Sequence, residues 1–338
     1  MIVVGSHANN VFCGKLAKEL QKLNYRDESI DFFPYEMKVF HDSERKIRLT
    51  DGFDDNTGFK DPDQLIYRIR RGEMVVSVFR GKSGENWNPD GLFVEALLTL
   101  GALRSYGADQ RRLCAVFPYY IYSRQHDITV EGECHSAKIV RKAIKDGLAG
   151  IMITVSAHNY RHEGEMDNRV WNMDATESVI GFAPNLRLLP ERYIVTPDSG
   201  QYSGKLRFPL ANSLNAGTIA FGKERDVQSG EIDVEVRNLE GLKNPGEVSL
   251  LLYDDERSTG ETMFDDIELC LEHGIKKENI HAIAIHDKNV VGEKYNKYAD
   301  ALIAETGVNF YSSDSIESPR TAFSVTPQLA SYIKKRFW

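Results

Sequence analysis

Short apolar runs rich in β-branched residues alternate with segments of helical spacing along the chain. The runs predict strands at 1–6, 74–81, 113–120, 151–158, 193–200, 218–223, 248–255 and 280–287. Helical spacing predicts helices over 9–20 and 91–107, the second ending at Gly107 as a C-cap. Continuous apolar strands that alternate with helices predict an α/β fold of parallel sheets, each covered on both faces.

The length of 338 residues favours two domains over one. The polar stretch 161–178 has no clean periodicity and is the best candidate for their junction. We therefore expect an N-terminal domain over 1–170 and a C-terminal domain over 171–321.

Composition and charge argue against membrane, nucleic-acid-binding and secreted proteins. Hydrophobic residues make up 41% and charged residues 27% of the chain, as in ordinary soluble proteins, and no run of 18 apolar residues predicts a membrane span. A net charge of −8 argues against a nucleic-acid partner. The N-terminus does not resemble a signal peptide, and no pair of cysteines has C-x-x-C spacing, so we expect free thiols in a reducing cytoplasm. The four cysteines are Cys13, Cys114, Cys134 and Cys270.

The segment "LLYDDERSTGET" (251–262) is the most informative stretch. A strand is expected to end at Tyr253, with Asp254 and Asp255 following at its carboxyl end. A helix is expected behind "STGET", where free backbone N–H groups favour an anion. Two adjacent carboxylates suit a pair of vicinal hydroxyls or a hydrated Mg²⁺. The alternative is a solvated turn with a threonine N-cap.

An apolar strand followed by two acidic residues and T-G-x-T resembles the phosphoribosyl diphosphate motif of phosphoribosyltransferases and ribose-phosphate diphosphokinases. The rest of the chain resembles the diphosphokinase family more closely, because further elements fall in that family's order from residue 39 onward. These are "VFHDSE" (39–44), "FPYYIYSRQHD" (117–127), "TPDSG" (196–200), "GKER" (222–225) and "FSVTPQLASYIKKRFW" (323–338).

The resemblance implies an ATP site. Phe40, Asp42 and Glu44 would contact the adenine of a neighbouring subunit. Arg124 and Gln125 would bind the nucleotide, which suits the donor fork of arginine. From the sequence alone, Phe40 could instead be a core aromatic.

The resemblance also implies a metal and a group-transfer loop. His158 would lie near the metal and the ATP phosphates, and Asp198 would help to hold Mg²⁺. Lys223 and Arg225 would close over the transferring group. His158 could instead be a capping or core histidine, and Asp198 an ordinary turn residue.

A sugar site completes what the resemblance implies. The ribose hydroxyls would bind Asp254 and Asp255, and the 5-phosphate would bind the following loop. That loop comprises Ser258, Thr259, Gly260, Glu261 and Thr262.

The implied protein has two phosphoribosyltransferase-like domains, with the closing helix 322–338 packing back on the first. Its reaction would be Mg²⁺-dependent transfer of the diphosphoryl group of ATP to the anomeric hydroxyl of ribose 5-phosphate, giving phosphoribosyl diphosphate and AMP. Since the 39–44 element would serve a neighbour's site, a homo-oligomer is implied, a dimer or a hexamer.

Two departures from the family concern the acceptor. Ser258 stands where an acidic residue is expected, and Glu261 stands where a glycine is common. A carboxylate facing a phosphate would repel it by about 1 kcal/mol at 4 Å even in water. These departures leave open a larger acceptor such as ADP-ribose. A catalytically silent regulatory homologue is a further alternative, against which Lys223 and Arg225 argue.

Overall fold

A computed structural model of the protein describes residues 1–25, 28–54, 58–128, 130–158, 163–196, 201–225, 232–235, 239 and 241–337. The chain divides into two compact units. Unit 1 comprises residues 1–81, 88–174 and 325–338, and unit 2 comprises residues 82–87 and 175–324. The division at residue 174 lies close to the expected junction, whereas the excursion of residues 82–87 into unit 2 has no signal in the sequence.

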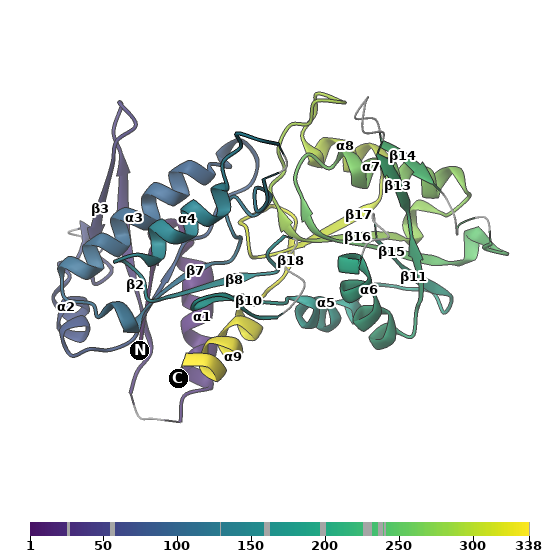
Figure 1. The fold of residues 1–338 in the computed structure, drawn as a ribbon. Coiled ribbons are helices and arrows are strands. Elements are labelled where there is room, and N and C mark those ends of the chain that lie inside the picture. The colour runs from purple at the N-terminus through teal and green to yellow at the C-terminus, as the bar shows by residue number, and fades with distance from the viewer. Residues whose placement is uncertain are drawn as a thin grey trace. The chain divides into compact units, whose positions relative to one another are not determined.

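Unit 1 is built on an eight-stranded sheet with a parallel centre and antiparallel edges (Figure 1). The strand order is β3-β2-β1-β6-β7-β8-β10-β9. The strands are β1 (Ile2–Ser6), β2 (Asp31–Val39), β3 (Arg45–Leu49), β6 (Val75–Val78), β7 (Leu113–Phe117), β8 (Ile151–Val155), β9 (Gly164–Asp167) and β10 (Val170–Met173). A separate small ribbon pairs β4 (Phe53–Asp54) with β5 (Gly58–Phe59).

The sheet order of unit 1 determines where its helices lie. From β1 the chain crosses to β2 in one direction, and from β6 through β7 to β8 it crosses in the other. Right-handed crossovers therefore put α1 (Asn10–Lys22) on one face and α3 (Pro89–Ser105) and α4 (Ser136–Lys145) on the other. The C-terminal α9 (Thr326–Phe337) packs beside α1, and α2 (Asp63–Arg70) precedes β6.

Unit 2 contains a wholly parallel six-stranded sheet in the order β12-β11-β15-β16-β17-β18. Its strands are β11 (Arg192–Thr196), β12 (Gly217–Ala220), β15 (Ser249–Arg257), β16 (Ile280–Asp287), β17 (Asn309–Ser313) and β18 (Thr321–Phe323), and a separate ribbon pairs β13 (Gly222–Arg225) with β14 (Ile232–Glu235). The helices are α5 (Thr176–Phe182), α6 (Gln201–Leu214), α7 (Glu261–Glu272) and α8 (Ala299–Thr306). Short 3₁₀ turns occupy His7–Asn9, Gln110–Arg112, Gly84–Asn86, Ala183–Asn185, Pro245–Glu247 and Lys277–Asn279 of the two units.

The centre of this second sheet is a topological switch point. The chain leaves β11 toward β12 in one direction and leaves β15 toward β16 and β17 in the other. Open α/β sheets bind ligands in the crevice beyond the carboxyl ends of two such strands. The acid-rich end of β15 therefore lies where the fold favours a site.

The α/β prediction is confirmed, since every expected strand is present and α1 and α3 form at the expected places. The stretch 161–178, in which we expected the domain junction, also contains regular structure. Residues 164–167 and 170–173 form the antiparallel pair β9 and β10 at the edge of the unit 1 sheet. In the described part of the chain, no helix combines the length and apolar character that crossing a bilayer requires.

The closing helix is held in unit 1 by apolar and polar contacts. Leu329 is fully buried, the Tyr332 hydroxyl donates to the Asn172 carbonyl at 3.0 Å, and the Gln328 amide donates to the Asp174 carbonyl at 2.5 Å. Strand β10 and the residue after it are thereby tied to α9.

Leu329→Ala should lower the free energy of unfolding by roughly 2–5 kcal/mol, because a buried leucine leaves a cavity when truncated. Urea denaturation of the full chain measures this loss. Ser331→Ala, at an exposed position of the same helix, should change stability by less than about 0.5 kcal/mol. Equal effects of the two substitutions would show that α9 is not part of the unit 1 core.

Candidate functional site

The acid pair lies inside a strand rather than behind it. The expectation that the strand ends at Tyr253 is wrong, because β15 continues to Arg257, which still pairs with Asp287 of β16. Asp255 is buried, with 4% of its surface exposed, and Asp254 is half-buried. The backbone N–H of Asp255 donates to the Asp254 carboxylate at 2.8 Å.

Asp254 carries an electrostatic penalty. Burial raises its pKa well above the ordinary value, and the charges of Asp255 and Glu256 raise it further. A group that donates hydrogen bonds to this carboxylate, or a cation, would relieve the penalty. Perturbed carboxylates at a switch point are typical of functional sites.

The next two charges of β15 are buried in ion pairs. The Glu256 carboxylate accepts from the Lys288 ammonium at 2.8 Å. The fully buried Arg257 guanidinium donates to Asp287 at 2.7 and 2.9 Å and to Asp300 at 2.6 Å. Sequence reasoning missed this cluster. One signal was available in the sequence: Asp287, the acidic residue at the end of "IHAIAIHD". In the sheet it stands opposite Arg257.

The loop behind β15 turns into α7 as expected, and α7 begins at Glu261. Gly260 has φ of +73°, and a Cβ there would approach the Ala299 Cβ to 2.8 Å, so only glycine fits without strain. Within the described part of the chain, the backbone N–H groups of residues 259–263 donate to no other group. Free amides at a helix N-terminus are an anion-binding arrangement.

Glu261, the residue that raised doubt about a phosphate, is held by its neighbours. One carboxylate oxygen accepts from the backbone N–H of Lys294 at 2.7 Å, and the other accepts from the Thr259 hydroxyl at 3.1 Å. A Cβ on Gly292 would overlap this carboxylate, so the two loops lie in close contact. The side chain of Glu261 is thus directed to the 292–294 loop.

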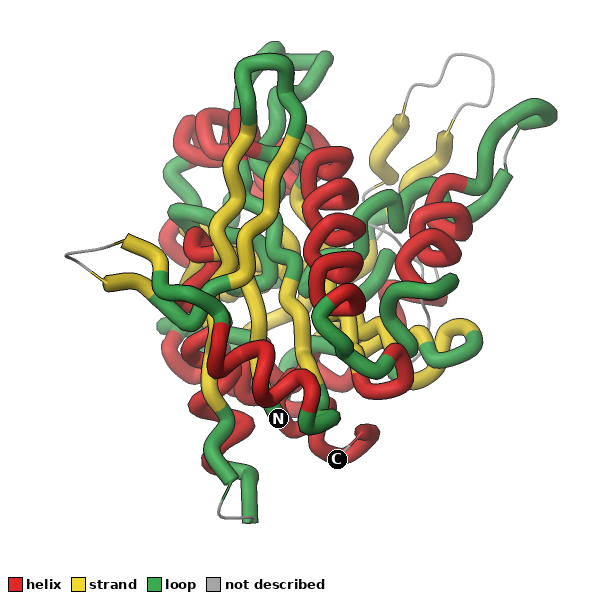
Figure 2. Tube along the Cα trace, turned by 90° about the vertical axis from the view of Figure 1, so that its left-hand side faces the viewer, coloured by secondary structure: helices red, strands yellow, loops and turns green. Residues whose placement is uncertain are grey.

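Phe40, Asp42 and Glu44 lie at the exposed tip of the β2–β3 hairpin of unit 1, which extends beyond the helices (Figures 1 and 2). The Phe40 N–H donates to the Glu44 carbonyl at 2.8 Å, and the Asp42 carboxylate accepts from the Glu44 N–H at 3.1 Å. The Lys38 ammonium lies 5.0 Å from the Phe40 ring centre, and 41% of Phe40 is exposed. Phe40 is therefore not a core aromatic.

Two loops meet at the carboxyl edge of the unit 1 sheet. Arg124 and Gln125 follow β7, and His158 follows β8. The His126 and His158 rings have centres 6.3 Å apart, and the Gln125 carbonyl accepts from the Ala137 N–H at the start of α4. His126 was missed, although it directly follows the predicted Arg-Gln pair.

The remaining predicted residues are not tested. Asp198 lies outside the described residues, as do the side chains of Lys223 and Arg225, whose backbone belongs to β13. Among the described residues, no group of three or more His, Cys, Asp or Glu side chains could hold a metal.

Comparison with known proteins places the chain among relatives with one name. It is 28% identical over 338 residues to the ribose-phosphate pyrophosphokinase of Sulfurisphaera tokodaii, covering 98% of this chain and 100% of the relative. It is 28% identical over 307 residues to the protein of the same name from Sulfolobus acidocaldarius, covering 90% and 91%. No family model matches the sequence.

The fold has a counterpart among solved structures. The phosphoribosylpyrophosphate synthetase of Mycobacterium smegmatis superposes with a TM-score of 0.71, covering 99% of this chain and 98% of that one at 20% identity. The resemblance noted in the sequence and the phosphoribosyltransferase-type fold are thereby confirmed.

Asp254→Asn should raise the free energy of unfolding at pH 7, on the order of 1 kcal/mol, by removing repulsion between adjacent carboxylates. Because the pKa of Asp254 is raised by folding, its ionisation costs stability only as pH rises above the unfolded value of about 3.9. The gain should therefore shrink as pH falls toward 3.9 in a series of thermal melts. The control Glu278→Gln, at an exposed carboxylate of unit 2, should be neutral. A variant no more stable than wild type at pH 7 would contradict the assigned repulsion.

Proposed function

We propose that this divergent member of the ribose-phosphate pyrophosphokinase family transfers the diphosphoryl group of ATP to the anomeric hydroxyl of ribose 5-phosphate. The products are phosphoribosyl diphosphate and AMP. The observation that carries the proposal is the sequence of features at the end of β15: a repelling acid pair, then a glycine turn, then free amides at the start of α7. A sugar phosphate would present its hydroxyls to the acid pair and its phosphate to the free amides.

Asp254 and Asp255 accept hydrogen bonds from the vicinal ribose hydroxyls, which offsets their mutual repulsion. The 5-phosphate is bound by the amides of residues 259–263, supported by the dipole of α7. The Thr262 hydroxyl is a further donor to it, whereas the Thr259 hydroxyl donates to Glu261. Glu261 does not oppose this binding, because its charge is held by Thr259 and the Lys294 N–H.

Mg²⁺ fits this set of residues. The ion usually takes only one or two protein carboxylates and completes its shell with water and phosphate oxygens. The adjacent Asp254 and Asp255 would offer hard oxygen ligands to the ion, and the family resemblance adds His158 and Asp198. When bound with ATP, Mg²⁺ supplies positive charge to the phosphate oxygens.

The transfer needs positioning and charge neutralisation more than covalent chemistry. The anomeric oxygen forms a bond to the β-phosphorus of ATP, the bond from that phosphorus to the oxygen on the α-phosphate breaks, and AMP leaves. The hydroxyl proton is released. Lys223 and Arg225 stabilise charge on the oxygens of the moving group, and Arg124 and Gln125 hold the nucleotide.

The exposed hairpin supports a shared ATP site. Phe40, Asp42 and Glu44 lie away from the core of their own unit, where a second subunit could bring its nucleotide against the ring. We therefore include a homo-oligomer in the proposal. The larger acceptor ADP-ribose receives no support from Glu261, since that carboxylate is already hydrogen-bonded.

The protein incubated with Mg²⁺ and ATP should release AMP, and ribose 5-phosphate should gain the mass of a diphosphoryl group. Lys223→Ala should reduce turnover more than tenfold with little change in ATP binding, because its charge acts mainly in the transition state. Lys243→Ala, an exposed lysine of the same unit, is the control. Release of ADP, or addition of the diphosphoryl group only to ADP-ribose, would refute the proposed reaction.

Phe40→Ala should raise the KM for ATP, since stacking on an aromatic ring contributes roughly 1–3 kcal/mol per base, about 5- to 150-fold. The exposed Tyr67→Ala should leave that KM unchanged. Mixed oligomers of Phe40→Ala with Lys223→Ala should regain activity, because one composite site escapes both changes. Mixed oligomers without any recovery would place the whole ATP site within one chain.

A further inference from the structure

A basic cleft lies in unit 1, at the edge of the sheet opposite the loops that carry Arg124 and His158. Its volume is about 710 Å³, and its walls come from residues at the amino ends of the strands. Met1 precedes β1, Met74 precedes β6, Arg112 precedes β7, and Arg169 precedes β10. Arg124, His126 and His158 follow strands of the same sheet, so roughly 15 Å of strand separates the two edges. The cleft is therefore distinct from the ATP site proposed above.

Positive charge dominates this amino-edge cleft, although the whole chain has a net charge of −8. Six cationic side chains line it, against the two carboxylates of Glu28 and Glu73. The Glu73 carboxylate is already neutralised, since it accepts from Arg68 at 2.7 Å and from the N-terminal ammonium at 3.0 Å. The six cations are Arg71, Arg111, Arg112, Arg169, Lys335 and Arg336.

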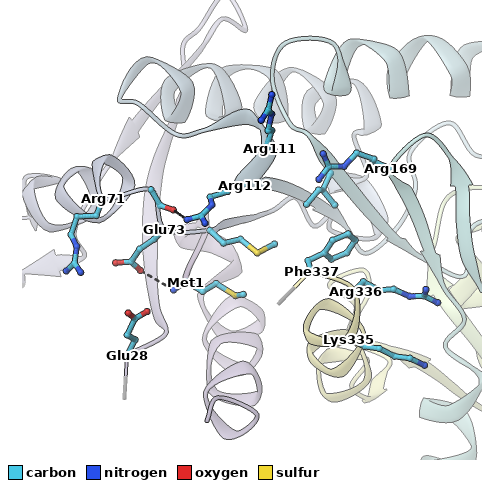
Figure 3. Close-up of a pocket in the computed structure, with 13 residues that line it drawn as sticks. Met1, Glu28, Arg71, Glu73, Arg111, Arg112, Arg169, Lys335, Arg336 and Phe337 are labelled. Atoms are coloured by element: carbon cyan, nitrogen blue, oxygen red, sulfur yellow. Dashed lines mark hydrogen bonds and ion pairs between the residues drawn. The ribbon is translucent and has the colours of Figure 1, made fainter. Parts of the chain in front are cut away.

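None of these six side chains has a carboxylate partner among the described residues. The Arg112 guanidinium donates to the Gly72 carbonyl, and Arg336 lies 4.9 Å from the Trp171 ring centre. In Figure 3, Arg111 and Arg169 approach from one side, Lys335 and Arg336 come from α9, and the Phe337 ring lies between. Such a concentration of unpaired charge in a concave surface attracts anions.

Only some of the six cations can be explained as residues that offset a helix dipole. Arg71 and the basic residues of α9 lie at helix C-termini, where cations offset the dipole. Arg111, Arg112 and Arg169 end no α-helix. Arg169 occupies the turn between β9 and β10 with φ of +61°, a conformation in which arginine is strained and glycine is not.

We propose that the amino-edge cleft binds a polyphosphate chain, either free or carried by a nucleoside. Arginine forks pair with phosphate oxygens in a bidentate manner, and several arginines suit several phosphates. The volume is that of a small-molecule site rather than a flat contact surface. The partly exposed Phe337 and Met74 side chains offer apolar surface for a base. The inference does not depend on the proposed reaction.

Inorganic tripolyphosphate titrated calorimetrically into the full chain tests the proposal. EDTA is included so that Mg²⁺-dependent binding elsewhere is suppressed. We expect saturable binding that weakens as salt is raised from 0.05 to 0.5 M, since salt screens the charges. In Arg111→Ser/Arg112→Ser/Arg169→Gly the affinity should fall at least tenfold. The glycine suits the backbone of position 169, so this variant should remain folded.

A control with the same loss of charge is Arg187→Ser/Lys276→Ser/Lys277→Ser, at exposed positions of unit 2. It should bind tripolyphosphate as the wild type does. Lys335→Glu/Arg336→Glu approaches the cleft from α9 and should weaken binding independently. Equal affinity of the wild type and the Arg111/Arg112/Arg169 variant, or no binding to the wild type, would overturn the proposal.

Comparison of ligands identifies the form of polyphosphate. Phe337→Ala should weaken ATP binding in EDTA but not tripolyphosphate binding if a nucleoside is bound, and should affect neither if the chain is free. A single-stranded RNA 12-mer should compete no better than tripolyphosphate. RNA binding that is at least a hundredfold tighter would replace the small ligand with a nucleic acid and refute the proposal.

Discussion

The geometry of the loop 258–262 depends on the contacts of the buried Arg257 guanidinium. It joins the end of β15 to Asp287 at the end of β16 and to Asp300 in the first turn of α8. It also lies 3.8 Å from the centre of the Phe310 ring of β17. A buried charge is tolerated only when its partners are well placed, so these elements hold one relative arrangement. Removing one partner would leave an unpaired charge where the loop begins.

This ion-pair cluster explains what the sequence could and could not predict. The apolar runs predict the parallel strands because strands buried on both faces need continuous apolar residues. The four charges after Tyr253 are typical of a loop, yet they continue β15. Glu256 and Arg257 have partners far away in sequence, at Lys288 and Asp287. A local pattern contains no information about such pairing. The polar β9 was not recognised because it is a half-exposed edge strand, and the buried β10 is only four residues long, too short to show a periodic pattern.

The candidate site was more predictable than its surroundings. The acid pair and the glycine turn are local in the sequence, and the switch point follows from strand order. The energetic cost at Asp254 could not be foreseen, because it comes from burial and from neighbouring charges in the folded strand. Repulsion between carboxylates in the C-terminal half of β15 is expected to lower the stability of the fold. Such a loss is expected where function requires the charge.

The two departures from the family pattern have local contacts in the folded chain. Glu261 would repel a phosphate if it faced the loop amides, but the 292–294 loop provides an N–H for it and a glycine beside which it fits. Gly292 and Glu261 are 31 positions apart in sequence, so a comparison of short motifs could not predict that they are in contact. The neutral Ser258 is likewise not a gap in the charge balance, since the adjacent Arg257 finds its two carboxylates in β16 and α8. A substitution inside a motif therefore has to be judged with the side chains that the fold brings against it.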